Sequence, residues 1–226
     1  MKLTLISGIT LTALLSIYSC KHDFIGPTTP PMEGLCDLDS VYFQNQIMPI
    51  LISNCTESGC HNQKDCKAGI ALNSYSKMLS TVASVTSNDW KKNKLIKSLE
   101  DGRMPQNKPR FSTEQINVIK AWITQGASNN ACDENFSGCD LSTEVAFSSF
   151  INPLIANYCK GCHSGSNPNG NISLENYQDI RSIALDGRLY NSLVKSSNWM
   201  PKGGARLDDC RLQKIQSWID AGAPQN

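Results

Sequence analysis

The segment Cys159-Lys160-Gly161-Cys162-His163 has a longer counterpart earlier in the chain, Cys55-Thr56-Glu57-Ser58-Gly59-Cys60-His61. Similar residues surround both segments. A proline lies six residues before the first cysteine, an I-x-L-x-x-Y pattern follows the histidine, and a Met-Pro pair and a W-I-x-x-G-A ending come later. These features are Pro49, residues 70–75, Met104 and residues 122–127 in one copy, and Pro153, residues 172–177, Met200 and residues 218–223 in the other. The chain therefore contains two copies of one unit.

Each unit is predicted to be helical. Ser112 is a suitable N-cap with Gln115 in the capping-box position, and Ile119 and Ile123 then recur on one helical face before Gly126. The corresponding residues of the second unit are Asp208, Ile215, Ile219 and Gly222. A short helix is also predicted before each Cys-His segment, with the proline near its first turn. Because no period-2 pattern is sustained, we predict an all-α fold of two tandem small helical domains, residues 35–132 and 133–226.

The composition excludes one class of function and indicates a compartment. The 226 residues include 21 basic and 20 acidic side chains, so the chain lacks the basic excess typical of a nucleic-acid-binding protein. Ten cysteines are many for a protein of the reducing cytosol, where disulfides are rare. We therefore expect no nucleic-acid partner and an oxidising environment.

The N-terminus is predicted to direct export. Lys2 is followed by a mainly apolar stretch that ends at Cys20, too short and too interrupted for a spanning helix. Residues 1–19 are interpreted as a signal peptide, and the cysteine that follows resembles that of a bacterial lipobox. Residues 20–34 are rich in proline and glycine and are predicted to form a flexible lipidated tether. We expect a lipid anchor on the outer membrane, with the protein facing the periplasm or the cell surface; the alternative is ordinary signal cleavage and a soluble periplasmic protein.

The two Cys-His segments carry the chemistry. Cys159, Cys162 and His163 form a C-x-x-C-H sequence, which is typical of c-type haem attachment. Two thiols one helical turn apart form thioethers to the two vinyl groups of a haem, and the adjacent histidine ligates the iron. Residues 55–61 form C-x4-C-H, so two extra residues must bulge outward if Cys55, Cys60 and His61 are to hold a haem in the same way.

A methionine occupies the same place in each unit and is followed by proline. Met104 and Met200 are the candidate second axial ligands, because a thioether suits a low-spin haem iron and a His/Met pair raises its reduction potential. The proline prevents helix formation and leaves the methionine in a loop. The alternative is that both methionines only fill gaps in the core.

A helix ending at a Cys-Cys-His segment, a Met-Pro loop and a C-terminal helix with a tryptophan together resemble the cytochrome c family. The resemblance covers nearly all of residues 36–226, and its details resemble c-type cytochrome domains of bacterial outer-membrane lipoproteins. It implies two covalently attached haem c groups and electron transfer to or from other redox proteins, with no small-molecule substrate. It also implies that Trp122 and Trp218 lie in the core, where the C-terminal helix of each domain crosses the N-terminal one.

Two other functions remain open from the sequence. A dihaem peroxidase-type enzyme needs one haem iron whose sixth ligand can be displaced, and the paired Met-Pro elements count against it. A non-redox module would use the cysteines and histidines for zinc or disulfides. A closed zinc site needs four ligands, whereas each unit offers only two cysteines and one histidine locally.

Apart from Cys20, five cysteines lie outside the Cys-His segments: Cys36, Cys66, Cys132, Cys139 and Cys210. A disulfide between Cys139 and Cys210 would join the start of the second unit to its last helix. Cys36 has Cys132 or Cys66 as a candidate partner. Because five is an odd number, one thiol is left free or bonded elsewhere, and the sequence leaves the connectivity open.

Overall fold

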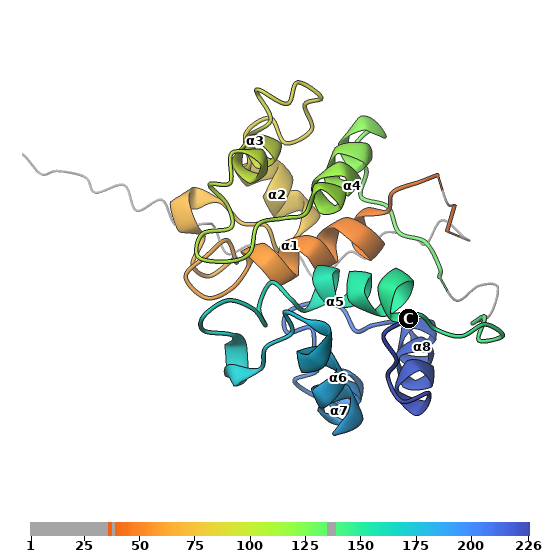
Figure 1. The fold of residues 1–226 in the computed structure, drawn as a ribbon. Coiled ribbons are helices and arrows are strands. Elements are labelled where there is room, and N and C mark those ends of the chain that lie inside the picture. The colour runs from red at the N-terminus through yellow and green to blue at the C-terminus, as the bar shows by residue number, and fades with distance from the viewer. Residues whose placement is uncertain (1–35, 38, 135–138) are drawn as a thin grey trace, which may run out of the picture.

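The computed structural model describes residues 36–37, 39–134 and 139–226 (Figure 1). Within these ranges the chain forms eight α-helices and no β-strand, which confirms the predicted all-α fold. The predicted signal peptide at 1–19, the lipidation site Cys20 and the tether at 20–34 lie outside the described residues. Below, the first unit means residues 36–132 and the second unit means residues 139–226.

The elements of the two units follow each other in a similar order. The first unit contains the π-helical turn η1 (Phe43–Ile47), α1 (Met48–Cys55), the 3-10 turn η2 (Lys67–Gly69), α2 (Tyr75–Thr81), α3 (Lys94–Glu100) and α4 (Thr113–Thr124). The second contains the π-helical turn η3 (Phe147–Ile151), α5 (Asn152–Tyr158), the 3-10 turn η4 (Asn169–Asn171), α6 (Tyr177–Leu185), α7 (Arg188–Val194) and α8 (Asp209–Asp220).

The predicted helix ends are confirmed. The Ser112 hydroxyl accepts a hydrogen bond from the Gln115 backbone N–H, and the Gln115 side chain accepts one from the Ser112 N–H, so α4 begins with a complete capping box. The Asp208 carboxylate accepts from the Arg211 N–H at the start of α8. Pro49 and Pro153 lie in the first turns of α1 and α5, where a missing N–H leaves no helical bond unmade.

The described core forms two hydrophobic clusters, one within each unit. The same aromatic trio lies at both centres: Phe43, Tyr75 and Trp122 in the first, and Phe147, Tyr177 and Trp218 in the second. Both tryptophans are almost fully buried, as expected, and each tyrosine hydroxyl donates to an alanine carbonyl of the W-I-x-x-G-A ending. The repeat in sequence therefore corresponds to a repeat in packing, while the domain boundary at residues 132–133 stays a prediction.

The start of each unit is tied to its end through an asparagine. In the second unit the Asn226 side chain accepts a hydrogen bond from the Phe147 N–H at 2.7 Å, and the Asn226 carbonyl accepts from the Ser148 N–H at 2.9 Å. Asn130 makes the same two bonds to the N–H groups of Phe43 and Gln44. These bonds satisfy donors at the first turn of η3 and η1, which no residue within the turn can satisfy.

Asn226→Ala should therefore lower the free energy of unfolding by about 1 kcal/mol, because the Phe147 N–H loses its side-chain acceptor. Urea denaturation followed by circular dichroism measures the change. Gln225→Ala is the matched control, since Gln225 is the exposed neighbour of Asn226. Equal midpoints for the two variants would contradict a capping role for Asn226.

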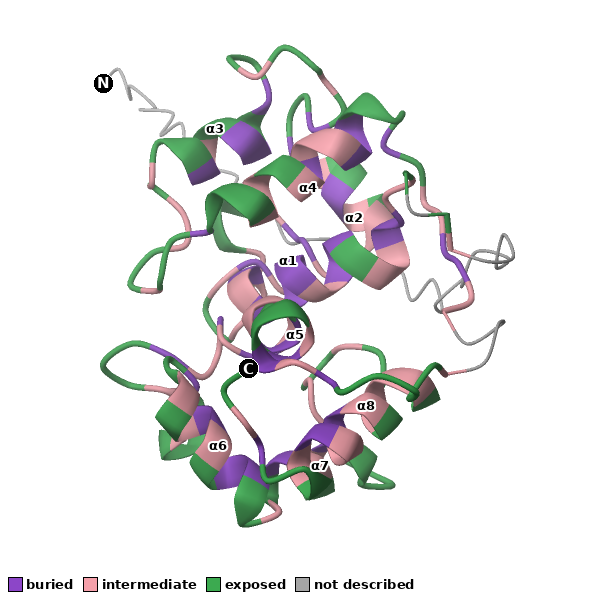
Figure 2. Cartoon of the chain, turned by 45° about the vertical axis from the view of Figure 1, so that its right-hand side comes forward, coloured by how far each residue is buried: buried purple, intermediate pink, exposed green. Residues whose placement is uncertain are grey.

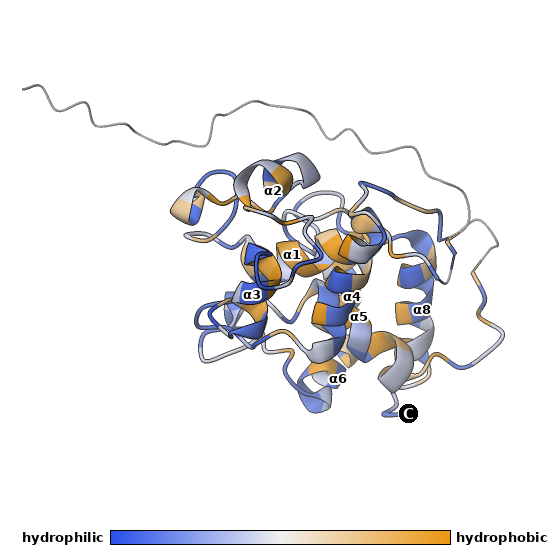
Figure 3. Cartoon of the chain, turned by 90° about the horizontal axis from the view of Figure 1, so that it is seen from above, coloured by the Kyte–Doolittle hydropathy of each residue, from blue (hydrophilic) through white to orange (hydrophobic). Residues whose placement is uncertain are grey.

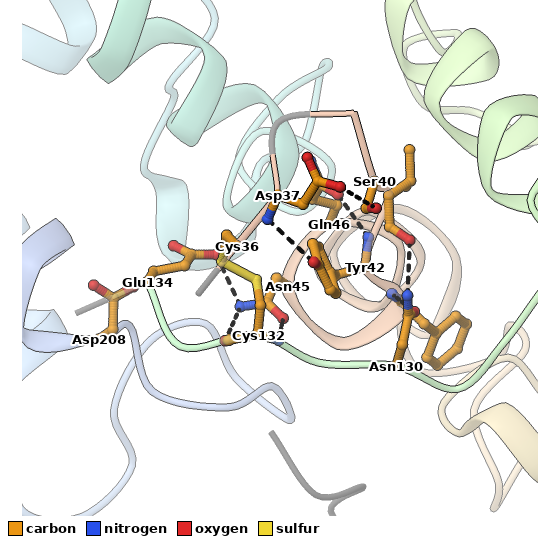
Figure 4. Close-up of a disulfide and its surroundings, with 12 residues drawn as sticks. Cys36, Asp37, Ser40, Tyr42, Asn45, Gln46, Asn130, Cys132, Glu134 and Asp208 are labelled. Carbon is orange, nitrogen blue, oxygen red and sulfur yellow. Dashed lines mark hydrogen bonds between the residues drawn. A yellow bond between two sulfur atoms is a disulfide. The ribbon is translucent and has the colours of Figure 1, made fainter. Parts of the chain in front are cut away.

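Two disulfides also join the ends of the units. Cys36 pairs with Cys132, and Cys139 pairs with Cys210, as predicted for the second pair and as one of the two alternatives for the first. Figure 4 shows the Cys36–Cys132 bond beside Asn45, whose amide donates to the Cys132 carbonyl and to Glu134. Cys66 is disulfide-bonded as well. Closing long loops in this way restricts the unfolded chain and so favours folding.

The two units meet where α1 lies against α5. Figures 1 and 2 show these helices side by side at the centre, with α2 to α4 on one side of the pair and α6 to α8 on the other. Figure 3 shows that α1 carries mostly hydrophobic residues, whereas α4 and α8 have hydrophobic and hydrophilic residues together. Helix α1 can be apolar on most of its surface because it is covered from two sides, by its own unit and by α5.

Candidate functional site

The two Cys-His segments make equivalent backbone hydrogen bonds although their lengths differ. The His61 N–H donates to the Cys55 carbonyl at 3.0 Å, and the His163 N–H donates to the Cys159 carbonyl at 3.1 Å. After each histidine the chain turns back, so that its carbonyl accepts from the N–H of a leucine, Leu72 or Leu174, at 2.8 and 2.7 Å. Both cysteine-histidine pairs are therefore held in equivalent places, at the ends of α1 and α5.

Both histidine rings are oriented by one bond to the backbone. Nδ1 of His61 lies 3.3 Å from the Ile70 carbonyl oxygen, and Nδ1 of His163 lies 3.2 Å from the Ile172 carbonyl oxygen. Because a carbonyl oxygen can only accept, Nδ1 carries the proton in both rings. Nε2 of each ring then keeps its lone pair, which is the arrangement found for metal-ligating histidines.

The two extra residues of the first segment form a turn supported by its own hydrogen bonds. The Asp65 carboxylate accepts from the Gly59 N–H at 2.6 Å and from the Asn62 amide at 2.7 Å, and the same amide donates to the Glu57 carbonyl. Gly59 has φ of +77°, which favours glycine. The predicted bulge is therefore stabilised locally, and the histidine that follows keeps the conformation seen in the shorter segment.

These hydrogen bonds lower the pKa of Asp65 below its ordinary value of 3.8, with the Asn62 amide as the largest cause and the Gly59 N–H next. A lowered folded-state pKa contributes stability that is present above pH 3.8 and is lost as the pH falls through the folded value. Asp65→Ala should therefore lower the urea midpoint at pH 7, and the gap from wild type should narrow as the pH falls below 3.8. Asp65→Asn keeps an oxygen acceptor without charge, so its urea midpoint should differ from that of Asp65→Ala by an amount that depends little on pH. A gap between Asp65→Ala and wild type that keeps its size below pH 3.8 would refute this account.

The candidate methionine ligands lie in equivalent loops. The Met104 N–H donates to the Ser98 carbonyl of α3 at 3.1 Å, and the Met200 N–H donates to the Ser192 carbonyl of α7 at 3.0 Å. Both side chains are half-buried. Met104 packs against the hydrophobic cluster that contains Cys55, and Met200 against the cluster that contains Cys159. Each methionine thus shares a cluster with the first cysteine of its own unit.

The four cysteines of the segments are free thiols: Cys55, Cys60, Cys159 and Cys162. All other described cysteines are disulfide-bonded. Burial, the largest cause in each case, raises the pKa of Cys55, Cys159 and Cys162 to about 12. Protonated, shielded thiols react slowly with oxidants and other thiols. The fold therefore separates two classes of cysteine, one oxidised and one kept as thiol beside a histidine.

The geometry does not favour zinc at these segments. Among the described residues, the one group of three metal-ligating side chains with mutually close ligand atoms is Cys36, Cys132 and Glu134. Cys36 and Cys132 form a disulfide and offer no thiolate. The cysteines and histidine of each segment are not gathered around one point as a closed tetrahedral zinc site requires.

The residue types are those that a c-type haem would need in each unit. Two thiols would each form a thioether, a histidine would offer Nε2, and a methionine on a separate loop would offer sulfur. The sequence analysis named all eight of these residues as candidates, and their role in binding haem stays a prediction. It missed the supporting ones: the carbonyls of Ile70 and Ile172, and the Asn62–Asp65 pair. Ile70 and Ile172 belong to the Ile-x-Leu pattern that follows each histidine, but this pattern does not indicate a hydrogen bond to the histidine ring.

No family model matches the chain, and the search of curated proteins and of solved structures finds no significant similarity. In the part of the chain that the structure describes, no helix is both long enough and apolar enough to cross a membrane.

Proposed function

We propose that this chain is a dihaem c-type cytochrome lipoprotein that transfers electrons. The observation that carries the proposal is the pair of matching sites: each histidine has Nδ1 bonded to a backbone carbonyl, and each lies beside two cysteines kept as thiols while the other described cysteines are oxidised. The arrangement occurs twice, with and without the two-residue insertion. A chance occurrence of one C-x-x-C-H sequence would not give the same arrangement at a second site.

The residues of each unit take separate roles. Cys55 and Cys60, and likewise Cys159 and Cys162, would hold one haem each through thioethers. His61 and His163 would ligate iron through Nε2, and Met104 and Met200 would each supply a sulfur ligand. A bound haem would supply an iron that exchanges one electron between its ferrous and ferric states. If histidine and methionine both bind the iron, no coordination position is open to a substrate, which favours a carrier over an enzyme.

The proposal includes a cellular location and a class of partner. Disulfides at Cys36–Cys132 and Cys139–Cys210 are typical of an exported protein. Together with the signal-like N-terminus and Cys20, they support a lipid-anchored protein of the outer membrane that faces the periplasm or the cell surface. Its partners would be other redox proteins, namely cytochromes, reductases or oxidases.

The test is the number of covalent haems per chain, measured by pyridine haemochrome and intact mass on protein made in a host that attaches haem c. Wild type should carry two. Cys159→Ala/Cys162→Ala and Cys55→Ala/Cys60→Ala should each carry one, because each loses both thioether donors of one site. Cys139→Ala/Cys210→Ala is the matched control, since it removes two cysteines of the second unit and should keep both haems. A wild-type chain without covalent haem would contradict the proposal.

A further inference from the structure

The two Cys-His segments meet across the contact between α1 and α5. Gly161, in the middle of the second segment, lies directly against the backbone of α1: a Cβ at this position would overlap the Ser53 carbonyl oxygen and come within 2.5 Å of the Asn54 side-chain oxygen. The adjacent thiol of Cys162 donates to the same Ser53 carbonyl at 3.1 Å. Ser53 is two residues from Cys55 on α1. One cysteine of the second unit therefore lies beside the turn of helix that ends in a cysteine of the first.

A second contact comes from the insertion in the first segment. Glu57 belongs to the C-x4-C-H turn, and its carboxylate accepts hydrogen bonds from Lys108 Nζ at 2.9 Å and from the Asn169 amide at 2.8 Å. Asn169 begins η4, directly after the second Cys-His segment. The Glu57 and Lys108 side chains are about one-fifth exposed or less, so water screens their ion pair only in part. The longer spacing thus places a carboxylate between the Met104 loop and the second unit.

Other bonds join α5 to the first unit on either side of this contact, through η1 and α4. The Tyr158 hydroxyl donates to the Asn45 carbonyl at 2.8 Å, and the Gln115 amide donates to the Asn157 side chain at 3.1 Å.

We infer that Gly161 and Glu57 are positioning residues that hold the two Cys-His segments together, so that two haems bound by these segments would lie close enough to exchange an electron directly. This inference rests on the proposed function. Glu57, within the longer first segment, supplies the carboxylate at this contact.

The test uses the full-length protein with both haems attached and fully oxidised. Its electron paramagnetic resonance spectrum is compared with the sum of the spectra of the two single-haem variants, Cys55→Ala/Cys60→Ala and Cys159→Ala/Cys162→Ala. Direct contact predicts broadened signals in the two-haem protein that the sum does not reproduce. A two-haem protein whose spectrum equals the sum would overturn the inference and leave the proposed function standing. A chain that takes up no haem would overturn both.

Substitutions then test the two residues. Gly161→Ala forces its Cβ against Ser53 and should weaken the magnetic interaction, whereas Lys160→Ala, in the same segment, adds no atom at the contact and should preserve it. Glu57→Ala should also weaken the interaction. Glu57→Gln, which keeps an oxygen acceptor for Asn169, should restore part of it. Haem count, measured in parallel, separates a lost contact from a lost haem. An interaction unchanged in both Gly161→Ala and Glu57→Ala would overturn the role of these residues.

Discussion

Replacing Met200 with alanine is expected to open one haem iron of the proposed cytochrome to external ligands. The Met200 N–H donates to the Ser192 carbonyl and its side chain packs against the second hydrophobic cluster. Residues 139–226 contain no second methionine that could take its place. The variant should bind cyanide and carbon monoxide at half of its haem, while the wild type binds neither. It should also lose the sulfur-to-iron charge-transfer band of that haem and gain peroxidase-type activity. Met104→Ala should behave in the same way at the other site.

Met200→His is the control that separates ligand type from coordination number. Histidine refills the position, so the variant should not bind external ligands, but the reduction potential of that haem should fall by on the order of 0.1 V or more, within the range of about 0.8 V that axial ligands span. A spectroelectrochemical titration measures the fall. Ligand binding by wild-type protein to the same extent as by Met200→Ala would contradict methionine ligation and favour the dihaem peroxidase-type alternative.

Local signals in the sequence were enough to predict much of the fold. The capping box at Ser112 and the N-cap at Asp208 depend on residues three positions apart, and the first-turn prolines of α1 and α5 on a single residue each. Of the clustered aromatics, only Trp122 and Trp218 were predicted to lie in the core, as the resemblance to the cytochrome c family implied. The π-helical turns before α1 and α5 were missed, since they depend on Asn130 and Asn226, about 80 to 90 residues away in the chain.

The same distinction between local signals and contacts of distant residues applies to the candidate site. The candidate haem-binding cysteines and histidines were identified by spacing, because the thioethers and the ligating ring would come from one short segment. Met104 and Met200 were identified because they occupy the same place in the two units. The contact between the segments was not identified, because it depends on how α1 meets α5. Gly161 gave no signal, since a C-x-x-C-H sequence accepts many residues in its middle positions. The partner of Cys36 stayed open for the same reason: only the folded chain places Cys132 beside it.

Trp218→Ala should have the largest effect on stability, a loss of about 3–5 kcal/mol in the free energy of unfolding. The side chain is fully buried, stacks on Phe147 with ring centroids 5.9 Å apart, and donates through its indole N–H to the Pro224 carbonyl at 2.9 Å. Removing the ring leaves a cavity and an unpaired carbonyl. Trp218→Phe keeps most of the apolar contact but loses the hydrogen bond, so about 1–3 kcal/mol should be lost.

The same variant tests the predicted division at residues 132–133. The hydrophobic cluster around Trp218 shares no residue with the cluster around Trp122, so the substitution removes contacts from the second unit alone. We therefore expect urea denaturation, followed by circular dichroism and by haem absorbance, to show an early transition of the second unit and a later one of the first. Because the contact between α1 and α5 also contributes to the first unit, the later transition should shift slightly below that of wild type. A single transition by both probes would show instead that the two clusters unfold together, and that the repeated units form one cooperative domain.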